Sequence, residues 1–209
     1  AWPAMEQSRQ SAAWLQWLQA IPPEVVEVRP VLCAACGWAL LDQGKLEAGG
    51  VWLERAEGWL DAKGEGATVV DDEQFRQLPA SIASARAYCA LAFGDVPGTI
   101  RYARRALALL PSEAHLLRGT PAALSGLALW ADGQLAEADS ALAEAQASFE
   151  KAGNLLYAIT GVYVLADVRK ARGRRREAEA AYTHGLQMAH SGAHSVLWAT
   201  ADIYTGLAD

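Results

Sequence analysis

The stretch Gly133-Gln-Leu-Ala-Glu-Ala138 decides the fold, because versions of it recur along the chain. Residues 44–48 read Gly-Lys-Leu-Glu-Ala, residues 173–178 read Gly-Arg-Arg-Arg-Glu-Ala, and a shorter version, Gly-Asp-Val, begins at Gly94. The four glycines lie 50, 39 and 40 residues apart. Self-similarity at this spacing is typical of repeat proteins, and a glycine before a helical pattern indicates a turn between two helices.

Other positions keep constant offsets from these turn glycines. Seven residues before them stand small residues: Gly37, Ala87, Gly126 and Ala166. Twelve residues after them stand Ala56, Ala106, Ala145 and Gly185, and nine after them stand Leu53, Ala103, Leu142 and Tyr182. Small residues recurring on one helix face indicate helix crossing points. We therefore predict that the larger residues of the second helix pack over the small residues of the first.

Composition limits the protein to a helical globular class. The 209 residues are 52% hydrophobic and 20% charged, which excludes intrinsic disorder. Apolar residues recur at spacings of three and four, so the sequence predicts helices of roughly 13 to 20 residues and no strand. No apolar run reaches the roughly 18 residues of a membrane span. Three cysteines, an odd number, suit a reducing compartment, and we expect a cytoplasmic protein.

The sequence therefore predicts one all-α helical-repeat domain over residues 1–209, folded as a right-handed α-solenoid with one concave face. A single hairpin exposes too much apolar surface, so it must stack on its neighbours. Because the chain starts without methionine and stops inside a helical pattern, we expect a piece of a longer protein. The predicted parts are an N-terminal capping helix within 1–30, about four full pairs at 31–63, 72–110, 114–151 and 155–190, and the start of a fifth pair at 195–209.

Charge argues against broad nucleic-acid contact by this region. The formal net charge is −6, with 7 basic and 13 acidic residues in 1–100 and 11 of each in 101–209. A basic cluster straddles the turn at Gly173: Arg169, Lys170, Arg172, Arg174, Arg175 and Arg176. It suits either a docking patch for an acidic partner or nucleotide, or a solvated turn. The second interpretation is favoured, because Glu177 and Glu179 follow at once and cations suit a helix C-terminus.

No residues suggest catalysis, a metal or a cofactor in this fragment. Cys33-Ala-Ala-Cys36 has redox or zinc spacing, but no further zinc ligands occur at compatible spacing, so core packing is the preferred interpretation. His190 and His194 lack a completing carboxylate or cysteine. No paired carboxylates or nucleophile motif stands out, so we predict that the chain is not an enzyme.

One buried arginine is expected in the second predicted pair. Arg86 lies eight residues before Gly94, where the other repeats place inward-facing residues. A buried guanidinium needs acceptors. These are either structural, from a carboxylate or helix-end carbonyls, or they belong to a ligand. Arg118 invites the same two interpretations.

The concave surface is expected on the first helix of each pair, six and three residues before the turn glycine. These positions give Trp38, Tyr88, Leu127 and Asp167, then Leu41, Leu91, Trp130 and Lys170, with Tyr163 nearby. Aromatic side chains with a few polar groups suit sugars, peptides or flat effectors, although the same spacing also suits a core. The candidate binding residues are Trp38, Arg86, Tyr88, Trp130, Tyr163, Asp167 and Lys170.

The offsets resemble those of the tetratricopeptide repeat, although spacings near 40 exceed its usual length of about 34 residues. The segments at 15–26 (Leu-Gln-Trp-Leu-Gln-Ala-Ile-Pro-Pro-Glu-Val-Val) and 29–41 (Arg-Pro-Val-Leu-Cys-Ala-Ala-Cys-Gly-Trp-Ala-Leu-Leu) resemble the helical-repeat sensor domain of MalT-type, LuxR-family, ATP-dependent transcriptional regulators. So do the segments 86–95, 117–119 and 152–155.

This resemblance implies a larger regulator, with an ATPase module before the repeats and a helix-turn-helix module after them. Neither is in this sequence, which has no Gly-x-x-x-x-Gly-Lys-Ser/Thr phosphate loop. The implied partners are a small-molecule effector or regulatory protein, other domains of the same regulator, and, through self-association, a second copy of the chain. The alternative is a plain tetratricopeptide scaffold for a peptide or protein. The first predicts an enclosed aromatic pocket, the second an open charged groove.

Overall fold

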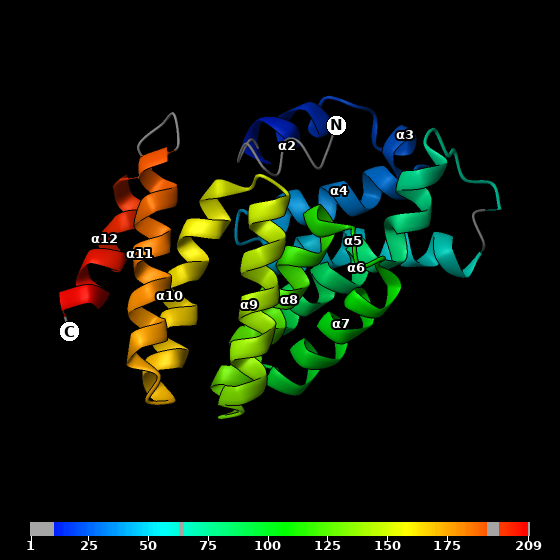
Figure 1. Ribbon diagram of the computed structural model, residues 1–209. Helices are drawn as coiled ribbons and strands as arrows, with labels where there is room; N and C mark the ends of the chain where they lie inside the picture. The colour runs from blue at the N-terminus through cyan, green and yellow to red at the C-terminus, as the bar shows by residue number, and fades with distance from the viewer. Residues whose placement is uncertain (1–10, 63–64, 192–196, 209) are drawn as a thin grey trace.

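The computed structural model describes residues 11–62, 65–191 and 197–208, and every regular element in those ranges is an α-helix. Figure 1 shows the helices side by side in a row that runs from the N-terminal to the C-terminal part of the chain. Their bounds are α2 (Ser11–Gln19), α3 (Pro23–Glu27), α4 (Pro30–Leu41), α5 (Leu46–Asp61), α6 (Asp72–Ala92), α7 (Val96–Leu109), α8 (His115–Ala131), α9 (Leu135–Lys151), α10 (Leu155–Ala171), α11 (Arg175–Ser191) and α12 (Leu197–Ala208).

Consecutive helices pack as pairs, and each pair stacks on the next. The pairs are α4 with α5, α6 with α7, α8 with α9, and α10 with α11, while α12 packs on α10 and α11. The first helices of successive pairs also touch, α4 with α6, α6 with α8 and α8 with α10. The predicted all-α solenoid of helical repeats is therefore confirmed.

The N-terminal region holds two short helices, α2 and α3, both packed on α4. The break between them falls at Pro22 and Pro23, where Pro22 is the N-cap of α3 and Pro23 occupies its first turn. Proline lacks the N–H that a continuing helix needs, but it suits a helix start. Residues 1–10 and 192–196 lie outside the described residues, and with them the first part of the predicted N-terminal capping region (1–30) and the first residues of the predicted fifth pair.

Each turn glycine ends a first helix in the same way. Gly44, Gly94, Gly133 and Gly173 have φ between +73° and +78°, a region that costs other L-residues about 1–2 kcal/mol. The N–H of Gly133 donates to the carbonyl of Trp130 (3.0 Å), and the next N–H donates to the carbonyl of Leu129 (2.9 Å). The same two bonds recur at the other three glycines. This is the Schellman motif, and it reverses the chain tightly enough for the paired helices to touch.

The predicted interlock of large and small residues is confirmed in the first and third pairs. A Cβ added at Gly37 would lie 2.8 Å from Leu53 Cδ2, and one added at Gly126 would lie 2.6 Å from Leu142 Cγ. Both leucines are buried. The glycines therefore hold the two helices of each pair at a distance that no larger residue allows.

We expect Gly126→Ala to lower the free energy of unfolding by about 1–3 kcal/mol, because the new methyl overpacks a buried contact with Leu142. The matched control is Gly50→Ala in α5, where a new Cβ meets nothing within 4 Å. This control should stabilise the protein by about 0.5–1 kcal/mol, since alanine favours a helix interior. Urea unfolding of both variants measures the difference.

The double variant Gly126→Ala/Leu142→Ala tests the contact itself. Removing the leucine side chain relieves the overlap, so the two substitutions should cost less together than the sum of their separate costs. Additive costs, or a stabilising Gly126→Ala, would contradict this account of the crossing.

Candidate ligand-binding site

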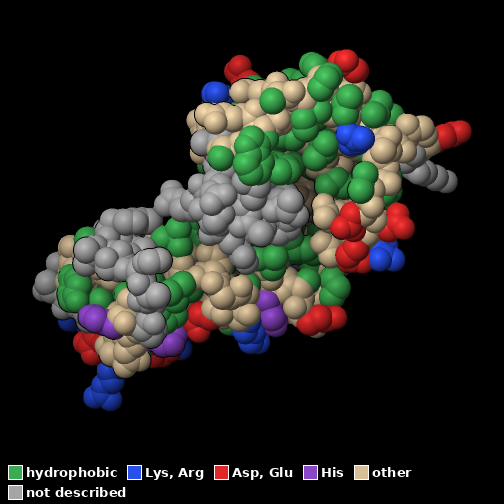
Figure 2. Space-filling model, turned by 90° about the horizontal axis from the view of Figure 1, so that it is seen from above, with side chains coloured by type: hydrophobic (Ala, Val, Ile, Leu, Met, Phe, Trp, Pro, Cys, Tyr) green, Lys and Arg blue, Asp and Glu red, His purple; other side chains and the backbone are tan. Residues whose placement is uncertain are grey.

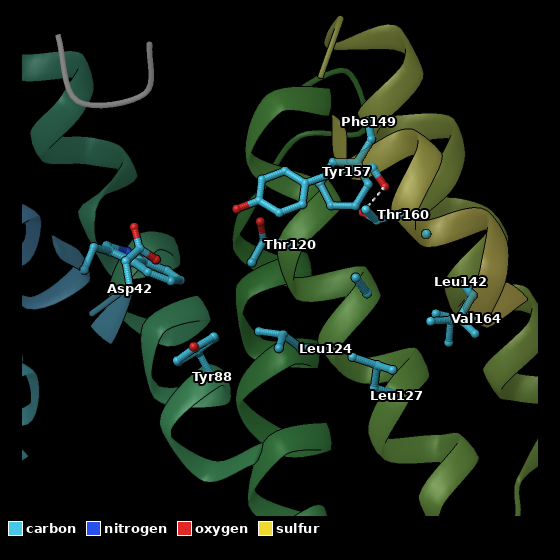
Figure 3. A pocket seen from close by; sticks show the side chains of 13 residues that line it. Asp42, Tyr88, Thr120, Leu124, Leu127, Leu142, Phe149, Tyr157, Thr160 and Val164 are labelled. Carbon is cyan, nitrogen blue, oxygen red and sulfur yellow. Dashed lines mark hydrogen bonds between the residues drawn. The ribbon is translucent and has the colours of Figure 1, made fainter. Parts of the chain in front are cut away.

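A hollow of about 320 Å³ opens between the first helices of the four pairs. Ligand sites in proteins begin near this size. Figure 3 shows side chains from the two sides of the hollow, with Asp42 and Tyr88 facing the wall that carries Thr120 and Tyr157. The lining residues are Trp38 and Asp42, Tyr88, Thr120, Ala123, Leu124 and Leu127, Leu142 and Phe149, and Tyr157, Thr160, Gly161 and Val164.

Aromatic rings stand on both sides of this hollow. Trp38 and Tyr88 are tilted toward one another with ring centroids 6.3 Å apart. Phe149 and Tyr157 make a closer pair, with centroids 5.3 Å apart and an interplanar angle of 31°. Between them lie the aliphatic chains of α8, so the hollow suits a ligand with an apolar, flat body.

The expected position six residues before the turn glycine does line the hollow in three of the four pairs. It supplies Trp38, Tyr88 and Leu127. In α10 the lining moves instead to residues 157–164, nine to sixteen residues before Gly173. The hollow therefore crosses the first helices obliquely, and each later pair contributes from nearer the start of its helix.

The two predicted residues at the hollow differ in their hydrogen bonding. Trp38 is only 7% exposed, and its Nε1 donates to Ser81 Oγ at 3.1 Å, so the indole N–H is already used inside the protein. Burial raises the pKa of the Tyr88 hydroxyl, and the nearby charge of Asp42 raises it further. Trp38 therefore offers a ring face, whereas Tyr88 offers a ring and a neutral hydroxyl.

Arg86 lies outside the hollow and has a structural partner. Its Nε and Nη2 donate to the two carboxylate oxygens of Glu57, at 3.0 and 2.6 Å. The hydrogen bond to Glu57 raises the pKa of the guanidinium. Arg118 likewise binds Glu144, and its Nη1 donates to the carbonyls at 107 and 110 that end α7. Both guanidinium groups therefore have acceptors within the protein, as the structural interpretation requires.

The remaining four predicted residues also lie away from the hollow. Trp130 packs on the cluster of Leu129, Leu142 and Val168, and Tyr163 packs on the cluster around α10 and α11. Asp167 accepts a hydrogen bond from the Tyr182 hydroxyl at 3.2 Å. Lys170 is half-buried near the end of α10. The structure thus brings together two of the seven predicted residues.

Sequence reasoning missed most of the lining. Thr120, Ala123 and Leu124 lie three to seven residues before Leu127, so helical periodicity could have placed them on the same face. Leu142 and Phe149 belong to α9, a second helix, and no spacing rule within a first helix points to them.

A family model described as the MalT-like TPR region matches residues 80–209 of the chain. The chain belongs to this family. The matched segment begins within α6, so it contains the parts of the hollow built by α6, α8, α9 and α10, while Trp38 and Asp42 precede it. A search of curated proteins finds no match.

In this MalT-like domain, half of the basic cluster is held by one buried carboxylate. Asp139, whose side chain is 6% exposed, accepts hydrogen bonds from Arg169, Arg172 and Arg174. Arg174 also pairs with Glu177. The carboxylate comes from α9 and the arginines from the end of α10 and the turn after it, so these ion pairs connect the third repeat to the fourth.

The three cysteines of the MalT-like chain are free and buried. Burial raises the pKa of Cys33 to about 11 and that of Cys36 to about 12. Cys33 Sγ donates to the carbonyls of Val26 and Glu27. Their neighbours are Leu78 and Ile82 for Cys33, and Leu18 and Val26 for Cys36, which agrees with the packing interpretation.

Two further observations concern the described residues. Within residues 11–62, 65–191 and 197–208, no group of three or more His, Cys, Asp or Glu side chains is placed to hold a metal ion. Among the helices of those ranges, none is both long and apolar enough to cross a membrane. His194 lies outside the described residues.

Figure 2 shows apolar side chains on the upper face and charged ones mainly around its edge.

We expect Asp139→Ala to lower the free energy of unfolding by about 2 kcal/mol. Removing a buried partner of several cations is costly, but these arginines keep between 20% and 37% of their side-chain surface in water, which limits the cost. The control Glu73→Ala breaks the exposed pair with Arg76 and should change stability by less than about 0.5 kcal/mol. Equal effects in chemical unfolding would contradict the structural role of Asp139.

We expect Cys33 and Cys36 in the native protein to react with iodoacetamide at pH 8 more slowly than in urea, by about 100-fold for Cys33 and about 1000-fold for Cys36, because only the thiolate reacts and burial suppresses it. The folded pKa values lie above the ordinary value of 9.0, so stability should fall as pH rises from 9 toward 11–12. Mass spectrometry and pH-dependent unfolding measure these effects. Rapid native alkylation would contradict the packing assignment.

Proposed function

We propose that this MalT-like domain is the effector-sensing and interaction domain of a LuxR-family, ATP-dependent transcription regulator, and that the effector is a small molecule bound in the hollow. The supporting observation is the hollow itself, a space of about 320 Å³ with aromatic pairs on both sides. Tetratricopeptide-type repeats are scaffolds rather than catalysts, so the domain acts by binding.

The position of the hollow gives binding a mechanical consequence. Its walls come from α4, α6, α8 and α10, one helix from each of the four pairs, and from α9. A ligand that touches all four prefers the solenoid shape in which these walls stand at the right separation. Binding therefore shifts the population toward that shape, provided that the ligand has different affinities for the two shapes. Other domains of the regulator, or a second copy, then respond to the changed shape.

The alternative is a scaffold that captures a peptide or protein partner. For such a partner we expect an open groove with charged side chains. Among the described residues that line the hollow, Asp42 alone carries a formal charge. The apolar lining therefore favours a small molecule.

In this proposal the regulator is cytoplasmic, and its gene encodes an ATPase module before the repeats and a helix-turn-helix module after them.

A thermal-shift screen of the chain against amino acids, amines, oligosaccharides and nucleotides tests the proposal. A ligand of the native state at 100 times its Kd adds about 2.7 kcal/mol of stability, which corresponds to roughly 5–10 °C in a domain of this size. The shift should vanish in Ala123→Phe, because a phenyl ring at Ala123 fills the hollow. It should persist in Ala136→Phe, a matched change on the exposed face of α9.

Three results would contradict the proposal. A compound that stabilises wild type and Ala123→Phe equally binds elsewhere, and a peptide that binds wild type and Ala123→Phe with equal affinity, when no compound binds the hollow, supports the scaffold. A complete gene lacking both flanking modules would also favour the scaffold.

A further inference from the structure

We infer that the groove between α9 and α11 binds a segment of a partner protein in which acidic residues are followed by apolar ones. The groove has a volume of about 320 Å³, and α10 supplies the part of its lining between the two outer helices. Figure 1 shows α9, α10 and α11 as neighbours in the row of helices. The groove shares no lining residue with the hollow, so binding there goes beyond the effector site proposed above and is independent of it.

The middle of the groove is apolar and is built from small side chains. Its α9 side runs from Ala143 to Glu150, a length of about 10 Å, which equals about three residues of an extended chain. Small side chains leave room for larger apolar side chains of a bound segment. The apolar lining residues are Ala143, Ala147, Val162, Leu165, Ala180 and Ala181.

One end of the groove is positively charged. Arg169 lines the groove, and its Nε donates to Asp139, which lies four residues before Ala143 and therefore on the same face of α9. Arg172 and Arg174 bind the same carboxylate. Both α9 and α11 begin near this end, and a helix N-terminus adds partial positive charge. The six cations of residues 169–176 outnumber Asp139 and the carboxylates of the same stretch, which are Asp167, Glu177 and Glu179.

The buried carboxylate of Asp139 fixes these arginines before a partner binds. Arg172 donates to it through Nη1, and among the described residues its Nε and Nη2 have no hydrogen-bond partner. The same holds for Nη2 of Arg169. A guanidinium that is already held in place loses little side-chain entropy when it binds a second anion. Carboxylates of a partner match these N–H groups, since arginine binds a carboxylate through two parallel hydrogen bonds.

Gln146 gives the groove a hydrogen-bond acceptor that the protein itself does not use. Its side chain lines the groove and is only 8% exposed. Its Nε2 donates to Glu150 at 2.8 Å, whereas its Oε1 has no hydrogen-bond partner among the described residues. The terminal torsion of glutamine is soft, so the amide can turn toward a donor in the groove. A main-chain N–H is such a donor, which favours a protein segment over a free anion.

Three labelled peptides of equal length test charge and apolar contact separately. The first is Glu-Glu-Glu-Gly-Leu-Ala-Leu, the second has glutamine for each glutamate, and the third has serine for each leucine. Fluorescence anisotropy at about 50 mM NaCl should show that the second peptide binds wild type about tenfold more weakly than the first, because several exposed ion pairs are lost. The third should bind about three- to tenfold more weakly than the first, because less apolar surface is buried.

Variants of the basic end test the contribution of charge. Arg175→Gln/Arg176→Gln removes two exposed cations that have no ion pair among the described residues, and it should weaken the first peptide about three- to tenfold without affecting the second. The matched control is Arg104→Gln/Arg105→Gln, which removes an adjacent exposed pair of arginines from α7, outside the groove. This control should leave the affinities of all three peptides unchanged.

Variants of the groove test the site itself. Ala147→Phe fills the groove and should abolish binding of the first peptide, whereas Ala201→Phe, at an exposed position of α12, should preserve it. Gln146→Met keeps the side-chain size but removes the unused acceptor. It should weaken the first peptide about threefold while leaving the Tm equal or higher, because a buried acceptor without a partner is no longer present.

The inference is overturned if the glutamine peptide binds as tightly as the glutamate peptide, if Ala147→Phe keeps wild-type affinity, or if no peptide binds at millimolar concentration. Displacement of the first peptide by an equal concentration of inorganic phosphate would assign the site to a free anion. A wild-type dimer in analytical ultracentrifugation that Ala147→Phe dissociates would make the occupant a second copy of the chain. None of these results changes the thermal shift caused by a ligand of the hollow or its loss in Ala123→Phe, so the proposed function is tested separately.

Discussion

The structure depends on how closely the two helices of a pair approach one another. At Gly37 and Gly126 the absence of a Cβ lets a leucine of the partner helix sit directly over the backbone. The Schellman turns bring those partners together within a few residues, because only glycine adopts their positive φ without strain. The hairpin is therefore a unit of fixed geometry, and the solenoid is that unit repeated with small rotations between copies.

Fixed hairpins leave the joints between repeats as the place where shape can vary. The third joint is held by Asp139 of α9 with three arginines from the end of α10 and the following turn. A buried carboxylate with several charged partners has a defined geometry but a large desolvation cost, so it specifies an arrangement more than it stabilises one. The hollow takes part of its lining from α8, α9 and α10, which belong to the same two repeats, and in the proposed function a ligand there acts on the packing between repeats.

The hollow divides its tasks between two kinds of residue. In the proposed function, the aromatic rings and aliphatic chains provide the apolar contact area, while Asp42 and the hydroxyls of Thr120, Thr160 and Tyr88 are the polar groups of the lining. This division is common in small-molecule sites, where apolar contact supplies affinity and a few polar groups fix orientation. The polar groups come from four different helices, so a ligand that engages several of them senses the relative placement of the repeats.

The sequence by itself determined the helices, the turns, the close crossings and the family, because each depends on local spacing: the 3.6-residue period, the positive φ of glycine, and small residues at constant offsets. It also placed Trp38 and Tyr88 on the inner face. Only the tertiary structure decided which residues meet in the hollow. The solenoid rotates from one pair to the next, so the lining shifts along α10 to Tyr157 and takes Phe149 from α9. The same rotation sends Asp167 and Lys170, at equivalent positions in the repeat, away from it.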